Sequence, residues 1–228
     1  MKEKAVNTTC SILYGIAIAV LVITFSIGLP IYARQFYYWH IDSLDLVERT
    51  GYDYDTIKDA YDEVLDYLTI PGKEFGTGEL LYSEEGASHF ADCKVLFDLN
   101  AQAFLVAIWV LAVIIILKRK GLVTILKPRG LGIGFWAGVG TLGFFGVVAL
   151  LASLDFDTAF VVFHSIFFPG KDNWLFNPRT DQIIRVMPQD FFMNCAILIV
   201  SSIIILCLAL VVIGVIGKIR NKPEETKE

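Results

Sequence analysis

Charged side chains are missing from four long stretches of this 228-residue sequence, which cover residues 10–32, 97–117, 131–153 and 191–217. None of the four contains Lys, Arg, Glu or His, and Asp98 lies at the outer edge of the second. About 20 apolar residues in a helix cross the hydrocarbon core of a bilayer. Because 55% of the chain is also hydrophobic, an ordinary soluble domain is excluded. We expect an all-α fold: a four-helix transmembrane bundle with a small extracytoplasmic helical cap, forming one integral membrane domain over residues 1–228.

Cysteine is also scarce, and its four copies show neither zinc spacing nor a disulfide framework (Cys10, Cys93, Cys195 and Cys207). The sequence has no repeats, no nucleotide-binding loop and no basic patch of the kind that binds nucleic acid. Ion and proton pathways normally carry ionisable groups inside the spans, and these spans carry none. We therefore expect no cofactor, no metal and no nucleic-acid partner.

The distribution of charge predicts the orientation in the membrane, since basic residues gather on the cytoplasmic side. The loop 118–130 holds five basic residues and no acidic one, and both termini carry lysines (Lys2, Lys4, Lys218, Lys222 and Lys227) and Arg220. Segment 33–100 instead holds 5 basic and 15 acidic residues, and segment 154–190 holds 3 and 5. The loop and both termini are thus expected inside, and the segments 33–96 and 154–190 outside.

The outer segments contain several recognisable elements. An aromatic cluster over residues 36–39 is typical of a membrane–water interface. Apolar residues at helical spacing predict a helix over 56–68, with Asp55 as its N-cap. We expect this helix to cover the outer end of the bundle. Residues 83–117 are expected to form one helix that rises out of the bilayer. A short interfacial helix is expected over 156–167, and Pro188 is expected in the first turn of the last helix.

Histidine occurs only three times, as His40, His89 and His164, and every copy falls in an outer segment. Histidine is the side chain best suited to proton transfer near neutral pH. His40 follows the aromatic cluster and is interpreted as part of that interface. His89 lies among polar and titratable residues, and a carboxylate such as Asp92, one helical turn away, could fix its tautomer. His89 and His164 could therefore act together as a base and an acid.

Other interpretations of the histidines stay open at this stage. A single interfacial histidine is commonly just a satisfied polar group. Cys93, one turn from His89, could be a nucleophile, but a helical cysteine is more often a packing residue. Ser88 and Ser165 adjoin histidines without the glycines of a nucleophile elbow. The three histidines could also bind a metal, although no diagnostic spacing supports this.

The sequence resembles the four-span membrane proteins of Gram-positive bacteria that include the lipoprotein intramolecular transacylase. The resemblance covers nearly the whole chain. It rests on two groups of residues, one before the second span and one before the fourth (Ser83-Glu84, Ser88-His89, Asp92 and Lys94; Phe156, Phe163-His164, Phe167, Trp174, Asp181 and Pro188). The chain departs from the family at Glu85-Gly86, where a basic residue and then an acid are expected. It departs again at Cys93, where the family tends to have an aliphatic residue.

The resemblance implies an enzyme of the bacterial cell membrane that acts on a diacylglyceryl lipoprotein among membrane lipids. The acyl chain at the glycerol sn-2 position would move to the α-amine of the lipoprotein's N-terminal cysteine, which gives a lyso-form lipoprotein. The amine and ester belong to one molecule, so no enzyme nucleophile is needed.

On this interpretation His89 and His164 are catalytic. Supporting or oxyanion candidates are Asp92, Lys94, Ser88 and Glu84, and substrate-binding candidates are Trp174, Phe163 and Asp181. Two alternatives remain open: an acyl hydrolase that uses the same histidines, and a non-enzymatic tetraspan binding or scaffold protein.

Overall fold

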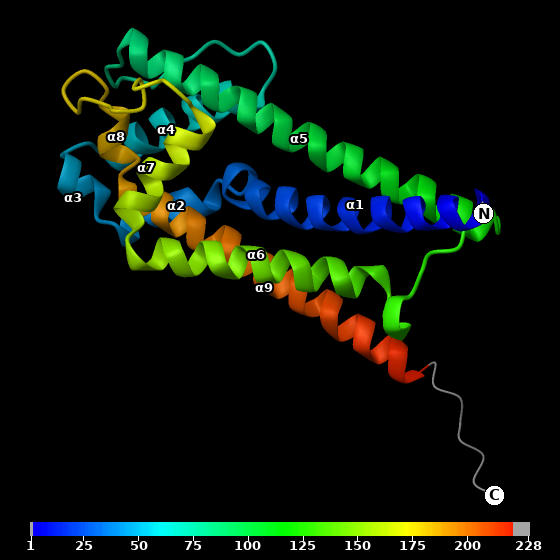
Figure 1. Ribbon diagram of the computed structural model, residues 1–228. Coiled ribbons are helices and arrows are strands. Elements are labelled where there is room, and N and C mark those ends of the chain that lie inside the picture. The colour runs from blue at the N-terminus through cyan, green and yellow to red at the C-terminus, as the bar shows by residue number, and fades with distance from the viewer. Residues whose placement is uncertain (1, 221–228) are drawn as a thin grey trace, which may run out of the picture. The chain divides into compact units, whose positions relative to one another are not determined.

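Four long helices dominate the computed structural model, which describes residues 2–220 (Figure 1). They are α1 (Lys2–Tyr32), α5 (Glu84–Arg119), α6 (Ile133–Leu154) and α9 (Gln189–Arg220). Each is long and apolar enough to cross a membrane, which confirms the four expected spans. Every regular element in the described part of the chain is helical. Lys222 and Lys227, used above to orient the tail, lie outside the described residues.

Shorter helices lie between the long ones, and most of them follow the predicted positions. They are α2 (Gln35–Ser43), α3 (Leu46–Thr50), α4 (Tyr54–Thr69), the single 3₁₀ turn η1 (Pro128–Gly130), α7 (Phe156–Phe167) and α8 (Ile183–Val186). The helices predicted over 56–68, 83–117 and 156–167 are confirmed as α4, α5 and α7. Pro188 lies immediately before α9 rather than inside it.

The chain divides into two compact units. Unit 1 comprises residues 1–26, 102–149 and 200–228, and unit 2 comprises residues 27–101 and 150–199. Each of the four long helices contributes residues to both units. All three histidines belong to unit 2.

Close packing in unit 1 depends on small residues, among them Gly134 and Gly138, which lie one turn apart on α6. A Cβ atom added at Gly138 would lie 3.0 Å from the carbonyl oxygen of Cys207 and 3.1 Å from Cβ of Leu210, so α6 and α9 touch here with almost no side chain between them. The Ser26 hydroxyl also donates to the Ser202 hydroxyl, at 3.0 Å, between α1 and α9.

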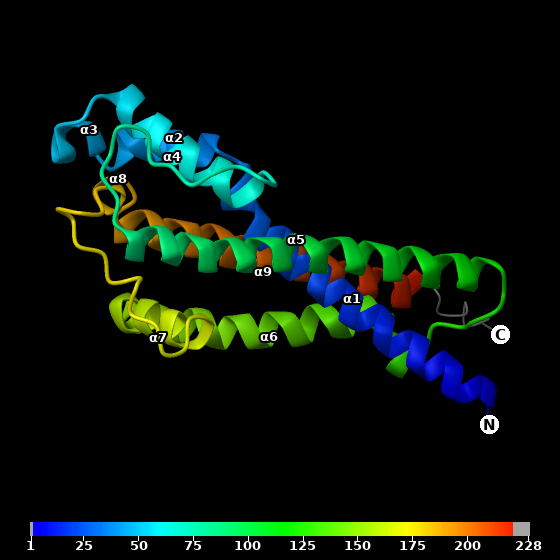
Figure 2. The ribbon, with the colours of Figure 1, turned by 90° about the horizontal axis from the view of Figure 1, so that it is seen from above.

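The core of unit 2 is the helical cap, in which α2, α3, α4 and α8 pack together (Figures 1 and 2). Tyr37 stacks on Tyr61 with ring centroids 3.7 Å apart, and its hydroxyl donates to the carbonyl oxygen of Val186 at 2.7 Å. The apolar face of α4 is buried against this core, as its amphipathic pattern predicts. Its N-cap, however, is Asp53 and not Asp55, because the Asp53 carboxylate accepts from the backbone amide of Thr56 at 2.7 Å.

The interpretation of residues 36–40 as an interfacial belt is wrong for Tyr37 and His40. Tyr37 and His40 are buried in the cap core, with 0% and 1% of their surface exposed. The Trp39 side chain, with 64% of its surface exposed, is the residue that fits an interfacial position. The reason is that this segment forms the helix α2, in which Tyr37 and His40 share one face, and that face meets α4 and the start of α9.

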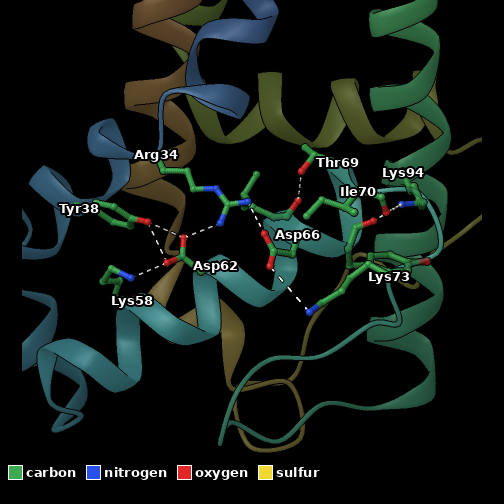
Figure 3. A network of polar contacts seen from close by, with 11 residues as sticks. Arg34, Tyr38, Lys58, Asp62, Asp66, Thr69, Ile70, Lys73 and Lys94 are labelled. Carbon is green, nitrogen blue, oxygen red and sulfur yellow. Dashed lines mark hydrogen bonds and ion pairs between the residues drawn. The ribbon is translucent and has the colours of Figure 1, made fainter.

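A charged network fixes α4 within unit 2 (Figure 3). Arg34 donates to Asp62 at 3.0 Å and to Asp66 at 2.5 Å. Asp62 also accepts from the hydroxyl of Tyr38 and the ammonium of Lys58, both at 2.7 Å. Burial raises the pKa of Asp62, but these hydrogen bonds outweigh burial and hold that pKa below its usual value. The carboxylate therefore stays ionised and joins α4 to α2 and to the turn that precedes α2.

Candidate active site

Two imidazole rings from separate outer segments come together in unit 2. His89 lies on α5 and His164 on α7, and their ring centroids are 5.7 Å apart with an interplanar angle of 32°. Both side chains are buried, with exposed fractions of 6% and 7%. The structure thus brings together the two histidines on which the sequence-based hypothesis depends.

The tautomer of His164 follows from one hydrogen bond. Its Nδ1 lies 2.8 Å from the carbonyl oxygen of Phe160, and a carbonyl oxygen only accepts, so Nδ1 carries the hydrogen. The lone pair of the neutral ring is therefore on Nε2. Burial lowers the pKa of His164 below its ordinary value, against a smaller opposing effect of the Phe160 hydrogen bond. At neutral pH the ring is thus unprotonated at Nε2 and can accept a proton.

His89 has a different environment. Its Nε2 lies 3.4 Å from Sγ of Cys93, and its Nδ1 is buried with no hydrogen-bond partner among residues 2–220. The rings of Phe168 and Phe176 pack edge-on against it, with centroids 4.9 and 5.4 Å away. A buried ring nitrogen without a partner is uncommon in proteins and is a feature of sites that bind a ligand.

The loop after α7 supplies the polar side of the site. Lys171 pairs with Asp92 at 2.5 Å, and the Nδ2 of Asn173 donates to Asp92 at 3.1 Å and to the Ser88 hydroxyl at 3.4 Å. Among the described residues, Asp92 makes no hydrogen bond to the His89 ring, and its carboxylate binds this loop instead. The expected role of Asp92 at the His89 ring stays a prediction. Reasoning from the sequence missed both Lys171 and Asn173, since neither stands next to a histidine in the chain.

Trp174 and Phe163, expected as substrate-binding residues, both contact His164. The indole of Trp174 stacks on the His164 ring with centroids 4.5 Å apart, and Phe163 meets the ring edge-on at 5.4 Å. The indole Nε1 donates to the carbonyl oxygen of Lys171 at 3.1 Å, which fixes its rotation. Trp174 therefore supports the His164 ring directly, while about half of Phe163 stays exposed.

Lys94 and Glu84 do not occupy the places expected of them. The ammonium of Lys94 donates to the carbonyl oxygens of Tyr67 and Ile70 at the C-terminal end of α4 (Figure 3). Lys94 therefore joins α5 to the end of α4, and its expected role at an oxyanion stays a prediction. Glu84 is exposed in the first turn of α5.

Asp181 anchors the start of α5. Its carboxylate accepts from the backbone amide and the hydroxyl of Ser83, at 2.9 and 2.7 Å. Burial raises its pKa, but the Ser83 hydrogen bonds and others lower that pKa to below its usual value. A Cβ atom added at Gly86 would lie 2.2 Å from Oδ1 of Asp181. A side chain at position 86 would therefore require the Asp181 carboxylate to move.

The third histidine has a structural role. His40 Nδ1 lies 2.6 Å from the carbonyl oxygen of Phe36, and the ring packs between Phe36 and Phe191. Within residues 2–220, no group of three or more His, Cys, Asp and Glu side chains could hold a metal ion. The three-histidine metal site considered above thus has no support from the geometry.

The chain matches known proteins both by sequence and by structure. A family model described as lipoprotein intramolecular transacylase Lit matches residues 12–192. The chain is similar to a solved structure of the membrane integral lipoprotein intramolecular transacylase Lit from Bacillus cereus, with a TM-score of 0.83 and 25% identity over 96% of this chain and 100% of that one. The resemblance inferred from the sequence is thereby confirmed.

Two structures of variants of the Bacillus cereus protein also match. Each has one histidine replaced, by arginine in one and by alanine in the other, and each gives a TM-score of 0.76 with 24% identity. The matches cover 96% of this chain in both cases, and 96% and 97% of the other chains. No curated protein sequence matches the chain.

Proposed function

The chain belongs to the lipoprotein intramolecular transacylase family, and we propose that it moves the sn-2 acyl chain of a diacylglyceryl lipoprotein onto the lipoprotein's own N-terminal amine. The observation that carries this proposal is the pairing of His89 with His164 at 5.7 Å between ring centroids. The chain is a multi-pass membrane protein, so both rings can be presented to a lipid-anchored substrate.

The reaction requires one proton to move. The amine nitrogen attacks the ester carbonyl, the new C–N bond forms, and the C–O bond to glycerol breaks. The amine loses a proton and the glycerol oxygen gains one, so no cofactor, oxidant or enzyme nucleophile takes part. Because both reacting groups belong to one lipoprotein, holding them in the reactive geometry supplies a large share of the acceleration.

We assign the base to His164, whose Nε2 carries the lone pair. This nitrogen takes the proton from the attacking amine and returns it to the leaving glycerol oxygen. Nε2 of His89 lies 3.4 Å from Sγ of Cys93, and we assign the tautomer in which this nitrogen accepts from the thiol. Nδ1 of His89 then carries the hydrogen, and it has no hydrogen-bond partner among residues 2–220. That N–H donates to the oxyanion that forms on the ester carbonyl.

We also propose the placement in the membrane. The excess of basic residues in loop 118–130 and at both termini favours a cytoplasmic location for them. The histidines then face the extracytoplasmic side at the depth of the lipid headgroups, where the diacylglyceryl group of a lipoprotein lies. The whole chain acts as one membrane domain, with membrane lipids around its spans.

Expression of the protein with a diacylglyceryl lipoprotein, followed by mass spectrometry of the N-terminal lipopeptide, tests the function. We expect an N-acylated, lyso-form product with an unchanged total acyl count. His89→Ala and His164→Ala should each reduce transfer by at least about 100-fold, with normal protein levels in the membrane. This is the lower end of the usual contribution of an oxyanion donor or of an acid–base group. His40→Ala is the control variant, because it removes a buried histidine outside the site and so shows the effect of such a substitution on folding alone. An unchanged lipopeptide in the presence of wild-type protein would refute the proposal.

The same experiment separates the two alternatives. An acyl hydrolase would release free fatty acid and lower the acyl count of the lipopeptide. A binding or scaffold protein would leave the lipopeptide unchanged and would tolerate both histidine substitutions.

A further inference from the structure

We propose that Asn173 binds the attacking α-amine of the lipoprotein, with its side-chain oxygen Oδ1 as the hydrogen-bond acceptor. The inference rests on the proposed function and names a residue that binds the substrate in that reaction. Asn173 stands in the loop between α7 and α8, where the sequence offers no motif to mark it.

The orientation of the Asn173 amide is fixed by Asp92. A carboxylate can only accept, so the amide nitrogen of Asn173 must be the group that faces it, at 3.1 Å. The same nitrogen lies 3.4 Å from the Ser88 hydroxyl. Lys171 binds the other carboxylate oxygen of Asp92 at 2.5 Å and holds the acid in place. The amide oxygen therefore points away from Asp92.

That oxygen is buried and has no hydrogen-bond partner among residues 2–220. Only one other buried side-chain nitrogen or oxygen in the described chain is in the same condition, Nδ1 of His89. Buried polar atoms are nearly always paired, because an unpaired one loses its bond to water without gaining another. Two such atoms in one site indicate a ligand that supplies their partners.

Asn173 is connected to both imidazoles through the residues that neighbour them. Its amide contacts Ser88 and Asp92, which lie on α5 one residue before and three residues after His89. The next residue in the chain, Trp174, stacks on the His164 ring. Asn173 is therefore tied to the elements that carry the proposed oxyanion donor and the proposed base.

The chemistry of the substrate decides which of its groups binds Nδ1 of His89 and which binds Oδ1 of Asn173. The ester carbonyl and the glycerol oxygen can only accept at the stage of attack, so they suit the N–H of His89. The free α-amine is the hydrogen-bond donor among the reacting groups, so it suits an acceptor oxygen. An amide oxygen binds an N–H without removing its proton, which leaves proton transfer to Nε2 of His164.

Holding the amine also favours transfer over hydrolysis. Water can attack the same ester if the amine is absent from the reactive position, and the acyl chain is then lost as free fatty acid. A residue that binds the amine raises its local concentration at the carbonyl and excludes water from that place.

Two measurements test the inference. The first uses an unreactive lipopeptide with ether-linked chains, either with a free α-amine or with that amine acetylated, and measures binding to the detergent-purified protein. We expect wild-type protein to bind the free-amine ligand at least tenfold more tightly, and Asn173→Leu to lose this preference. Asn177→Leu, at an exposed asparagine of the same loop, should keep it.

The second measurement is the product ratio with the natural ester substrate. Asn173→Leu should lower transfer at least tenfold and raise the share of free fatty acid, whereas Asn177→Leu should match wild type.

Equal binding of the two ether ligands by wild-type protein overturns the inference, whatever the variants do. Transfer by Asn173→Leu within twofold of wild type also overturns it, and Asn173→Ala is judged by the same criteria if the leucine variant does not accumulate. If the wild-type protein leaves the ester substrate unchanged, the proposed function has failed, and this outcome differs from both results that overturn the role of Asn173.

Discussion

The indole of Trp174 lies against the imidazole of His164, with ring centroids 4.5 Å apart and planes inclined by 27°. The backbone carbonyl of Phe160 holds the other side of the same imidazole through Nδ1. Together these contacts fix the position and the rotation of the ring before any substrate arrives. A base whose nitrogen is held in the reactive geometry needs little reorganisation during proton transfer.

The first prediction concerns this stacking contact. Trp174→Ala should lower the rate constant of transfer by about 10-fold to 100-fold, because loss of the stack lets the His164 ring tilt. Trp174→Phe keeps an aromatic face and should stay within about threefold of wild type. The rates are measured by mass spectrometry of the lipopeptide at saturating substrate. Trp39→Ala, at a tryptophan that is 64% exposed, is the matched control. Equal activity of Trp174→Ala and wild type would remove this residue from the mechanism.

The second prediction concerns the protonation of His164. Because burial lowers its pKa, the neutral ring should persist below the ordinary histidine value of about 6.5. The unfolded chain binds more protons than the folded chain in that window, so stability should fall as the pH drops below about 6.5. Nitrogen NMR of histidine-labelled protein, assigned with His89→Ala and His40→Ala, reports both the tautomer and the midpoint. A midpoint at or above 6.5, or a hydrogen on Nε2, would contradict the assignment of the base.

The fold was largely predictable because membrane helices are long and their composition is extreme. Charge-free stretches of about 20 residues have few alternatives to a transmembrane helix, and the four expected spans match four helices. The boundaries within the outer segments were less accurate. Residues 36–40 have the aromatic composition of an interface, yet Tyr37 and His40 are buried, since burial there depends on α4 and α8, which are distant in sequence.

The candidate site was predictable only in part, for a related reason. His89 and His164 stand out because histidine is rare in this chain and a family pattern surrounds them. Asp92 also stood out, but its actual partners, Lys171 and Asn173, lie in a loop about 80 residues further along. No local periodicity links those positions, so the hydrogen bonds of the site emerged only from the fold.

The third prediction concerns the packing of unit 1. Gly138→Ala should lower the thermal unfolding temperature of the protein in detergent by several degrees, because its Cβ would press on the backbone carbonyl of Cys207. Gly140→Ala is a matched control two residues away on α6, where an added Cβ meets nothing within 4 Å. That variant should unfold at or slightly above the wild-type temperature, since alanine is the better helix former. Equal effects of the two substitutions would contradict the close α6–α9 contact.

The fourth prediction concerns the orientation in the membrane. Basic residues concentrate in loop 118–130, whereas the segment 33–100 has a net charge of −10, so the two are expected on opposite sides. A membrane-impermeant maleimide should label Glu79→Cys in intact cells and should label Lys120→Cys only after permeabilisation. Both positions are exposed, and the unsubstituted protein measures the background from its own four cysteines. If Lys120→Cys reacts in intact cells and Glu79→Cys does not, the histidines face the cytoplasm. A lipoprotein substrate on the outer surface would then be out of their reach.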